Sequence, residues 1–348
     1  MFVWAAFLLL VLFILAFDLG VFSRESKALS ARAALVRTTV YFILALMFTV
    51  FVYFAYEHHL GGLGIYNLPE TEQGHPLEAG GHPVSDLPSN GFEAAAQFFM
   101  GYLLEQSLSI DNIFVIALIL GYFQVPAAFQ HRVLLWGILG ALVMRGVMIY
   151  LGIELIKHAA VTMYIFGALL LFTAFKMLFA GEGEVDFEKS RMVRLARRLF
   201  RLHPSFVEDH FFTRIDGKLA MTPMFLALII VETTDLVFAV DSIPAVIGLT
   251  QDPFLVFTSN VFAILGLRSL YFALADLLGR FHYLKYSLVA ILAFVGMKML
   301  VHDFLPHGQT GLITVISLGI IAISLGIGIA ASLMIPEHPD SSHGDIPT

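Results

Sequence analysis

Long apolar runs, separated by shorter polar segments, dominate the pattern of this chain. Runs of about 20 residues recur along its length, and such runs cross a bilayer as helices because backbone amides in lipid must be satisfied within the segment. The residue alternation of a membrane barrel is absent. The pattern predicts an all-α integral membrane protein with about nine transmembrane helices, over residues 2–22, 38–56, 95–121, 133–156, 161–180, 222–247, 255–278, 284–301 and 310–334.

The composition narrows the class of protein further. The chain is 58% hydrophobic and 14% charged, with a mean hydropathy of +0.84 and no cysteine. This excludes a soluble domain, disulfides, thiolate metal sites and thiol redox chemistry. The sequence also lacks an HExxH motif, a Gly-x-Ser-x-Gly elbow and a nucleotide-binding loop. We therefore expect no enzyme, no organic cofactor and no nucleic acid partner.

Basic residues predict the orientation of the helices. They gather after the first, fifth and seventh helices and between the third and fourth, whereas the opposite side has only Lys157. By the positive-inside rule the N-terminus lies outside and the tail at 335–348 lies in the cytoplasm. The basic segment 181–221, with an expected Arg-rich helical stretch, then lies along the inner leaflet. The external segment 57–93 is rich in acids and histidines, and is either a solvated loop or a collector of divalent cations. Residues 1–17 lack the features of a cleavable signal peptide, which favours a retained first helix.

Carboxylates stand at membrane depth in two of the predicted helices. The segments Glu105 to Ile113 and Asp235 to Ile243 share one pattern, namely an acid, five residues, an aspartate, a small polar residue and an isoleucine. A charge at the centre of a spanning helix costs roughly 2.5–3.5 kcal/mol, which indicates a functional site. The predicted metal ligands or proton carriers are Asp111, Asp235, Asp241, Glu105 and Glu232, with neutral oxygens from Asn112 and Ser242.

An alternative role for the same acids is to form structural ion pairs with two central arginines. A structural ion-pair network with Arg145 and Arg268 would also neutralise them, but five acids outnumber two arginines. We therefore interpret both arginines as counter-charges that hold the acids ionised when no cation is bound. Asp18 lies near the end of a predicted helix, where exposure to water explains it, and it stays a possible member of the site.

The two acidic segments belong to a longer internal repeat. Residues 95–180 and 222–301 both carry the two acids, then an arginine, then a Lys-Met-Leu sequence at Lys176 and at Lys298. Because each copy contains three helices, an odd number, the second copy has the opposite orientation, as in the inverted repeats of secondary transporters. We predict one polytopic membrane domain over 1–348, with residues 1–56 and 310–334 flanking the two copies.

This repeat places the acids at different depths. Glu105 and Asp235 fall near the midplane, Asp111 in the inner half and Asp241 in the outer half of the bilayer. Acids six residues apart on one helix lie about 9 Å apart along its axis and point about 120° away from each other. Either each helix is locally broken, for example near Pro244, or one acid from each copy meets at a shared site.

Several of these stretches resemble the TerC family of membrane proteins. They are Leu108-Ser-Ile-Asp111-Asn112, the segment from Glu232 to Val246, Asp18-Leu-Gly-Val-Phe22 and Lys298-Met-Leu300. The resemblance, which is closest to the Alx-type branch, implies the lysine-exporter superfamily, the bacterial inner membrane and export of Mn²⁺. It also implies that the metal-site aspartates fall on Asp111, Asp235 and Asp241. The family is named for tellurium resistance, but an acid-lined track should repel the tellurite anion.

The ligand types agree with a hard dication as transported substrate. Carboxylate, amide and hydroxyl oxygens suit Mn²⁺, Mg²⁺ or Ca²⁺, and do not choose among them. Clustered acids must lose protons before a dication binds, so proton coupling is natural. We predict a divalent metal cation transporter, with Mn²⁺ efflux preferred. The alternatives are a transporter of another cation or of an amino acid, and a non-transporting component of tellurium resistance or a stress response.

Overall fold

The computed structural model describes most of the predicted membrane helices. The described residues are 2–22, 31–64, 87–159, 161–179, 201–203, 210–215, 218–274, 283–301 and 310–334. Most of the predicted external loop, the first part of the basic segment and the C-terminal tail lie outside these residues.

Nine α-helices occupy the described residues, and they confirm an all-helical membrane protein. They are α1 (Phe2–Phe22), α2 (Ala31–Glu57), α3 (Gly91–Tyr122), α4 (Ala127–His158), α5 (Val161–Phe179), α7 (Pro223–Ile247), α8 (Pro253–Leu274), α9 (Leu284–Leu300) and α10 (Thr310–Met334). Seven of them are long and apolar enough to cross a membrane. In α1 the apolar stretch Phe2–Phe17 is shorter, and α9 has 17 residues.

Several helices begin before the apolar run that predicts them. The first residue of α3 is Gly91 because Asn90 is its N-cap and accepts a hydrogen bond from the Glu93 N–H at 2.9 Å. The Glu93 carboxylate in turn accepts one from the Ser89 N–H at 2.9 Å. These caps satisfy backbone donors that the first helical turn leaves unpaired, so the helix extends beyond its apolar part.

A small sheet occupies the second part of the basic segment 181–221. Its strands are β1 (Arg201–Leu202), β2 (Phe212–Ile215) and β3 (Lys218–Met221), in the order β1-β3-β2. β2 and β3 are antiparallel, and β1 and β3 are parallel. Most of the Arg-rich stretch that was expected to be helical lies outside the described residues, and no strand was predicted for this segment. The sequence signal for the hairpin is the Asp216-Gly217 pair, which follows a run rich in aromatic and β-branched residues from Phe211 to Ile215.

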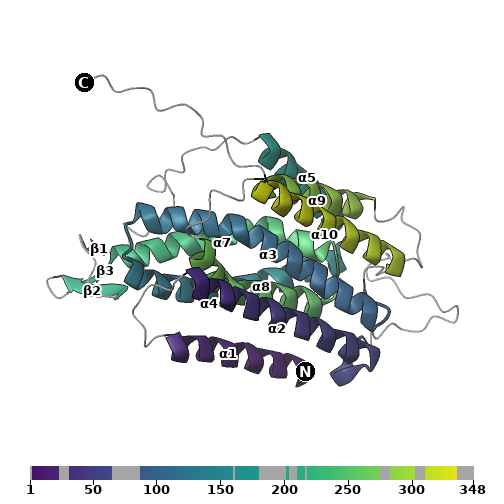
Figure 1. Ribbon diagram of the computed structural model, residues 1–348, viewed down its shortest axis with the longest axis horizontal. Coiled ribbons are helices and arrows are strands. Elements are labelled where there is room, and N and C mark those ends of the chain that lie inside the picture. The colour runs from purple at the N-terminus through teal and green to yellow at the C-terminus, as the bar shows by residue number, and fades with distance from the viewer. Residues whose placement is uncertain are drawn as a thin grey trace.

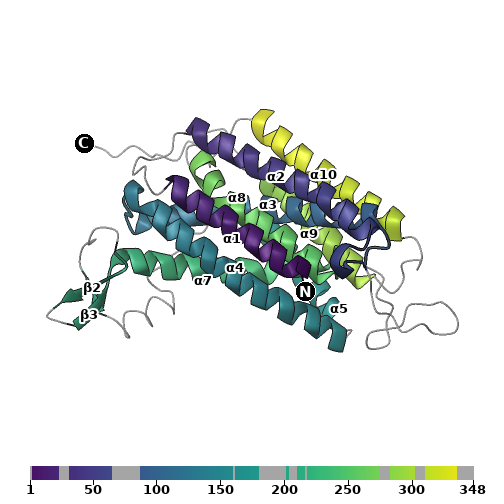
Figure 2. The same cartoon turned by 90° about the horizontal axis from the view of Figure 1, so that it is seen from below.

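The helices run side by side in one bundle, with the strands at one end (Figures 1 and 2). α3 packs on α8, α4 on α7 and α5 on α9, while α2 lies against α3 and α8. α8 is the central helix, since 94% of its spanning window is buried, against 33% for α4 and α7. α5 and α9 approach most closely at Gly167 and Gly296, where an added methyl group would lie 2.9 Å from the opposite carbonyl oxygen.

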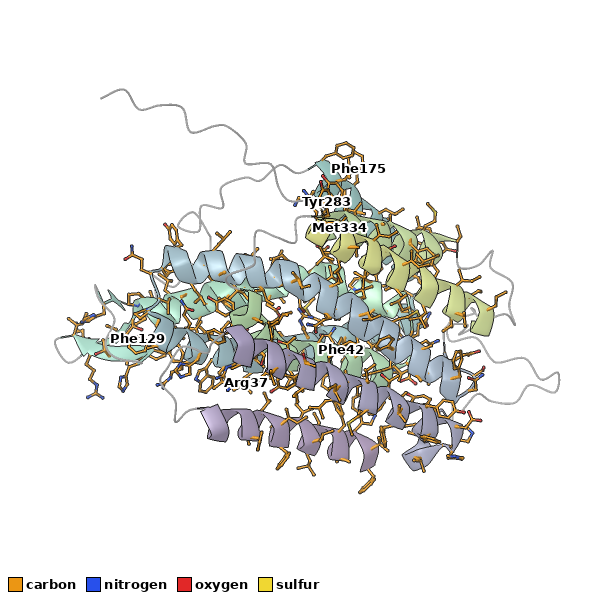
Figure 3. All side chains as sticks on the ribbon, in the orientation of Figure 1. Arg37, Phe42, Phe129, Phe175, Tyr283 and Met334 are labelled. Atoms are coloured by element: carbon orange, nitrogen blue, oxygen red, sulfur yellow. The ribbon has the colours of Figure 1, made fainter. Side chains whose placement is uncertain are left out.

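Large apolar side chains cover the outside of the bundle (Figure 3). Phe42, Phe175 and Met334 are 39%, 63% and 80% exposed. α1 is the outermost helix (Figure 1), and it contacts the rest through aromatic rings such as those of Phe7 and Phe254, whose centroids are 5.9 Å apart. An apolar exterior of this extent is what a lipid-facing surface requires.

Candidate functional site

Arg145 joins the two halves of the chain at the centre of the site. It lies on α4 with its side chain 2% exposed. Its Nη1 donates to Glu105 Oε2 on α3 at 2.5 Å. Its Nε and Nη2 donate to Asp235 Oδ2 and Oδ1 on α7 at 3.2 and 3.0 Å. The pair of Arg145 with Asp235 is therefore bidentate, which is the strong form of arginine–carboxylate pairing. One guanidinium therefore serves a carboxylate from each predicted repeat.

Asn260 of α8 completes this network. Its Nδ2 donates to Glu105 Oε1 at 2.7 Å, and its Oδ1 accepts from Arg145 Nη1 at 3.0 Å. The side chain is buried, at 1% exposure. Asn260 lies outside the repeated acidic motif and was not predicted as a site residue, although an amide inside an apolar membrane helix commonly forms hydrogen bonds between helices. Four helices, α3, α4, α7 and α8, thus contribute side chains to one polar centre.

Glu232 adds a third carboxylate beside this centre. It precedes Asp235 by one helical turn on α7, and the two carboxylates repel each other. Its Oε2 is buried and has no hydrogen-bond partner within the described part of the chain. The carboxylate packs against Gly140 of α4, where any Cβ would overlap it. The absence of a side chain at Gly140 therefore makes room for Glu232.

Asp241 lies apart from the other acids. It accepts a hydrogen bond from Thr173 Oγ1 on α5 at 2.9 Å, and Lys176 on the next turn of α5 interacts with it electrostatically. α7 runs on as a helix to Ile247 and includes Pro244. The local break that would let Asp235 and Asp241 hold one ion is therefore absent, and the acids that meet are Glu105 and Asp235.

The remaining predicted residues are placed as follows. Asn112 and Ser242 are buried, at 4% and 2% exposure, and the Ser242 hydroxyl oxygen has no hydrogen-bond partner among the described atoms. Arg268 is buried on α8 at 6% exposure. The side chains of Asp111 and Asp18 lie outside the described part. Within the part described, no three His, Asp or Glu side chains lie close enough together to hold a metal ion. The guanidinium of Arg145 lies between the carboxylates of Glu105 and Asp235, where a metal ion would otherwise bind.

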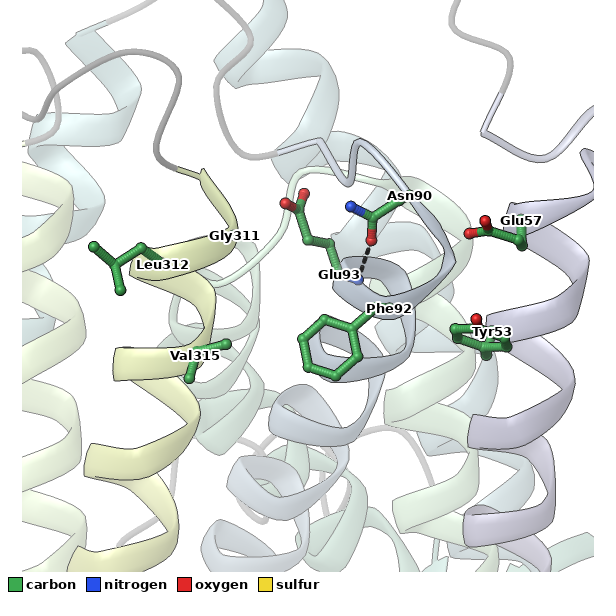
Figure 4. Close-up of a pocket in the computed structure, with 8 residues that line it drawn as sticks. All are labelled: Tyr53, Glu57, Asn90, Phe92, Glu93, Gly311, Leu312 and Val315. Carbon is green, nitrogen blue, oxygen red and sulfur yellow. Dashed lines mark hydrogen bonds between the residues drawn. The ribbon is translucent and has the colours of Figure 1, made fainter.

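The described edge of the predicted external acidic loop forms an open pocket. It has a volume of about 660 Å³ and is lined by Tyr53, Glu57, Asn90, Phe92, Glu93, Gly311, Leu312 and Val315 (Figure 4). Glu57 Oε2 accepts from the Gly91 N–H at 3.0 Å, and Glu93 accepts from the Ser89 N–H. These two acids therefore bind backbone amides at the start of α3. Of the other acids and histidines of the loop, His58 and His59 are described and the rest lie outside the described part, so the cation collector stays a prediction.

Comparisons with known proteins identify the family. Residues 90–339 match the model of the "Integral membrane protein TerC family". The chain is 39% identical over 344 residues, 99% of this chain and 96% of the relative, to "Uncharacterized membrane protein STKORF319" of Myxococcus xanthus. It is 42% identical over 302 residues, 86% of each chain, to "Putative membrane-bound redox modulator Alx" of Escherichia coli strain K12. No solved structure matches it significantly. The chain belongs to the TerC family of integral membrane proteins.

Proposed function

We propose that this protein transports a divalent metal cation across the membrane, with Mn²⁺ as the preferred cargo and efflux as the direction. The observation that carries the proposal is the charge balance at the buried centre. Arg145 pairs with Glu105 and Asp235, and Glu232, one turn before Asp235, adds a third carboxylate whose Oε2 has no hydrogen-bond partner among the described residues. When all three carboxylates are ionised, the centre is short of positive charge, and a dication supplies the missing charge. Buried, uncompensated charge in a membrane is expensive, so it is retained where function requires it.

The chemistry of the side chains favours a hard cation. All the candidate ligands are oxygen atoms of carboxylates, an amide or hydroxyls, which suit Mn²⁺, Mg²⁺ and Ca²⁺. We prefer Mn²⁺ from this set because the acidic motifs resemble those of the TerC family, for which Mn²⁺ export is expected. Carboxylates must lose their protons to bind a dication, so proton return is the natural coupling.

Arg145 acts in this scheme as a tethered competitor of the cargo. It binds Glu105 and Asp235 in the described conformation. A cation that approaches these acids must displace the guanidinium, and departure of the cation lets Arg145 pair with them again. Glu105 and Asp235 thus have a cationic partner in both states, which lowers the cost of each exchange.

The packing of the helices supports an inverted repeat around this centre. Exchanging α3 with α7, α4 with α8 and α5 with α9 turns the α3–α8 contact into the α7–α4 contact and leaves the α5–α9 contact unchanged. All three contacts are present. The acids that meet at Arg145, Glu105 and Asp235, occupy equivalent positions in the two copies. Transporters built from such repeats bind their cargo at the repeat interface.

The rival functions fit the geometry less well. An amino-acid cargo needs a cationic partner for its carboxylate, but Arg145 already binds two acids of the protein. A redox role, which the name of the Escherichia coli relative describes, has no thiol chemistry to use here because the chain has no cysteine. We therefore place metal transport first.

The test is metal uptake into inside-out vesicles. Uptake of Mn²⁺, Mg²⁺, Ca²⁺ and Zn²⁺ is measured for the wild type and for the Asp235→Asn and Glu232→Gln variants. Loss of one charged ligand removes about 1.5–3 kcal/mol, so Mn²⁺ uptake at low concentration should fall roughly 10- to 100-fold. Unchanged Mn²⁺ flux in both variants would remove the assignment.

Asp252→Asn is the matched control. Asp252 is another buried acid, but it caps α8 through the Phe254 N–H at 2.8 Å and accepts from the Tyr56 hydroxyl at 2.7 Å. Asparagine caps helices as well as aspartate does, so this variant should keep its fold and its flux. An equal loss of flux in the control would mean that the effect reports buried charge in general.

A further inference from the structure

The small sheet is held at the surface of the bilayer by its connection to α7. β3 ends at Met221 and α7 begins at Pro223, so one residue, Thr222, separates them. The Thr222 N–H donates to Phe211 O at 3.0 Å, and its Oγ1 donates to His210 O at 2.8 Å. α7 is apolar enough to cross the membrane from Pro223 onward. The sheet therefore lies at one membrane boundary, at the end of the bundle (Figures 1 and 2).

Aromatic rings tie the sheet to the ends of α4 and α7. The Phe211 ring lies 6.4 Å from Trp136 on α4 and 6.2 Å from Phe225 on α7, between centroids. The Phe212 ring lies 4.3 Å from that of Phe225. The Arg132 guanidinium lies 5.5 Å from the centroid of Phe211. Tryptophan at the edge of a membrane span, here 48% exposed, is typical of the layer between headgroups and acyl chains.

Basic and apolar side chains stand next to each other on the hairpin. Arg214 of β2 lies opposite Leu219 of β3, and the next pair on that face is Phe212 with Met221. On this face Leu219 is 54% and Phe212 37% exposed, and Arg214 is exposed as well. Lys218, which pairs with Ile215, is exposed on the other face. Apolar side chains can enter the acyl boundary at this level while the cationic groups reach phosphates.

We propose that the hairpin β2–β3 and Trp136 form an interfacial site for anionic phospholipids of the surrounding bilayer. Arg214 and Lys218 bind the phosphate groups, and Phe212 and Leu219 rest among the upper acyl carbons. Charge complementarity selects anionic over zwitterionic headgroups. The exposed side chains continue the lipid-facing surface of α4 and α7, which makes the bilayer their neighbour. The site is independent of the cargo that the protein transports.

The two tryptophans of the chain allow a direct test. The Trp4→Phe variant keeps Trp136 alone, and it is placed in bilayers of phosphatidylcholine and phosphatidylglycerol in which one lipid carries brominated acyl chains. Brominated phosphatidylglycerol should quench Trp136 at least about twofold more than brominated phosphatidylcholine at equal mole fraction. Adding Arg214→Gln and Lys218→Gln should abolish this difference.

The Trp136→Phe variant is the matched control because it keeps Trp4 alone. Trp4 packs against Phe254 at the start of α8, at the opposite end of α7 from the sheet, with ring centroids 5.3 Å apart. It should show no lipid preference. Arg214→Lys with Lys218 retained keeps the charge and should keep the preference at Trp136. Equal quenching of Trp136 by both lipids, or a preference that survives the double glutamine variant, would overturn the proposal.

Discussion

Replacement of Arg145 by glutamine tests whether a cation can take the place of the guanidinium. Arg145 donates four hydrogen bonds, to Glu105, to Asn260 and twice to Asp235. Glutamine has no charge and is too short to reach both acids. Breaking a buried ion pair by removing one partner costs about 3–5 kcal/mol, because the other charge is left uncompensated. Arg145→Gln should therefore be that much less stable in metal-free buffer.

Binding of a dication should restore most of the stability that the Arg145→Gln variant loses. Binding to the folded state alone stabilises a protein by about 2.7 kcal/mol at a concentration 100-fold above Kd. In the wild type, Arg145 competes for the same two carboxylates, so added Mn²⁺ should stabilise it less than the variant. The expected pattern is a low midpoint of unfolding for Arg145→Gln without metal, and a large rise with Mn²⁺.

The assay is unfolding in lipid nanodiscs, followed by tryptophan fluorescence across a Mn²⁺ titration. The control adds Glu105→Gln and Asp235→Asn to Arg145→Gln, which removes the uncompensated charges. This triple variant should regain stability without metal and lose its response to Mn²⁺. A response of equal size in the single and triple variants, or none in the single variant, would refute the role of these acids as the cation site.

Three further predictions concern the surroundings of this centre. Gly140→Ala should push Glu232 aside and lower Mn²⁺ uptake. The control is Gly137→Ala on the same face of α4, where the added methyl group would lie 3.4 Å from Val231 and should leave uptake intact. Equal uptake in both variants would contradict the packing argument. Asn260→Leu removes two hydrogen bonds to charged groups, at about 1.5–3 kcal/mol each, so thermal unfolding should show a loss of about 3–6 kcal/mol in this variant and in Asn260→Ala; full stability would mean that Glu105 does not need the amide. Metal affinity measured by calorimetry should fall as pH drops from 8 to 5, because protonated carboxylates do not bind dications, and a flat profile would argue against carboxylate ligands.

The spacing of residues along the chain was sufficient to find the acids, but not their partners. The repeated acidic motif singled out Glu105 and Asp235 because charges are rare in apolar runs. Their joint binding to Arg145 depends on α3, α4 and α7 lying side by side. Sequence left open whether the acids of one helix or of two copies would meet. In the structure the acids that share a partner come from different helices, α3 and α7, since acids six residues apart on one continuous helix point in different directions.

Asn260, Gly140 and Thr173 were found only through tertiary contacts. No sequence motif marks any of these residues. Each of them contacts a carboxylate that belongs to a neighbouring helix. The small sheet was not predicted either, although the Asp216-Gly217 pair is a hairpin signal.

The sequence by itself determined that this is a helical membrane protein with carboxylates at membrane depth and no thiol chemistry. Those properties follow from composition and from the length of the apolar runs, because each run decides by itself whether its segment can cross the membrane as a helix. Only the tertiary structure decided which acid binds which partner, because that choice depends on how four helices pack against one another. Glu105 and Asp235 share one guanidinium, while Asp241 turns to α5.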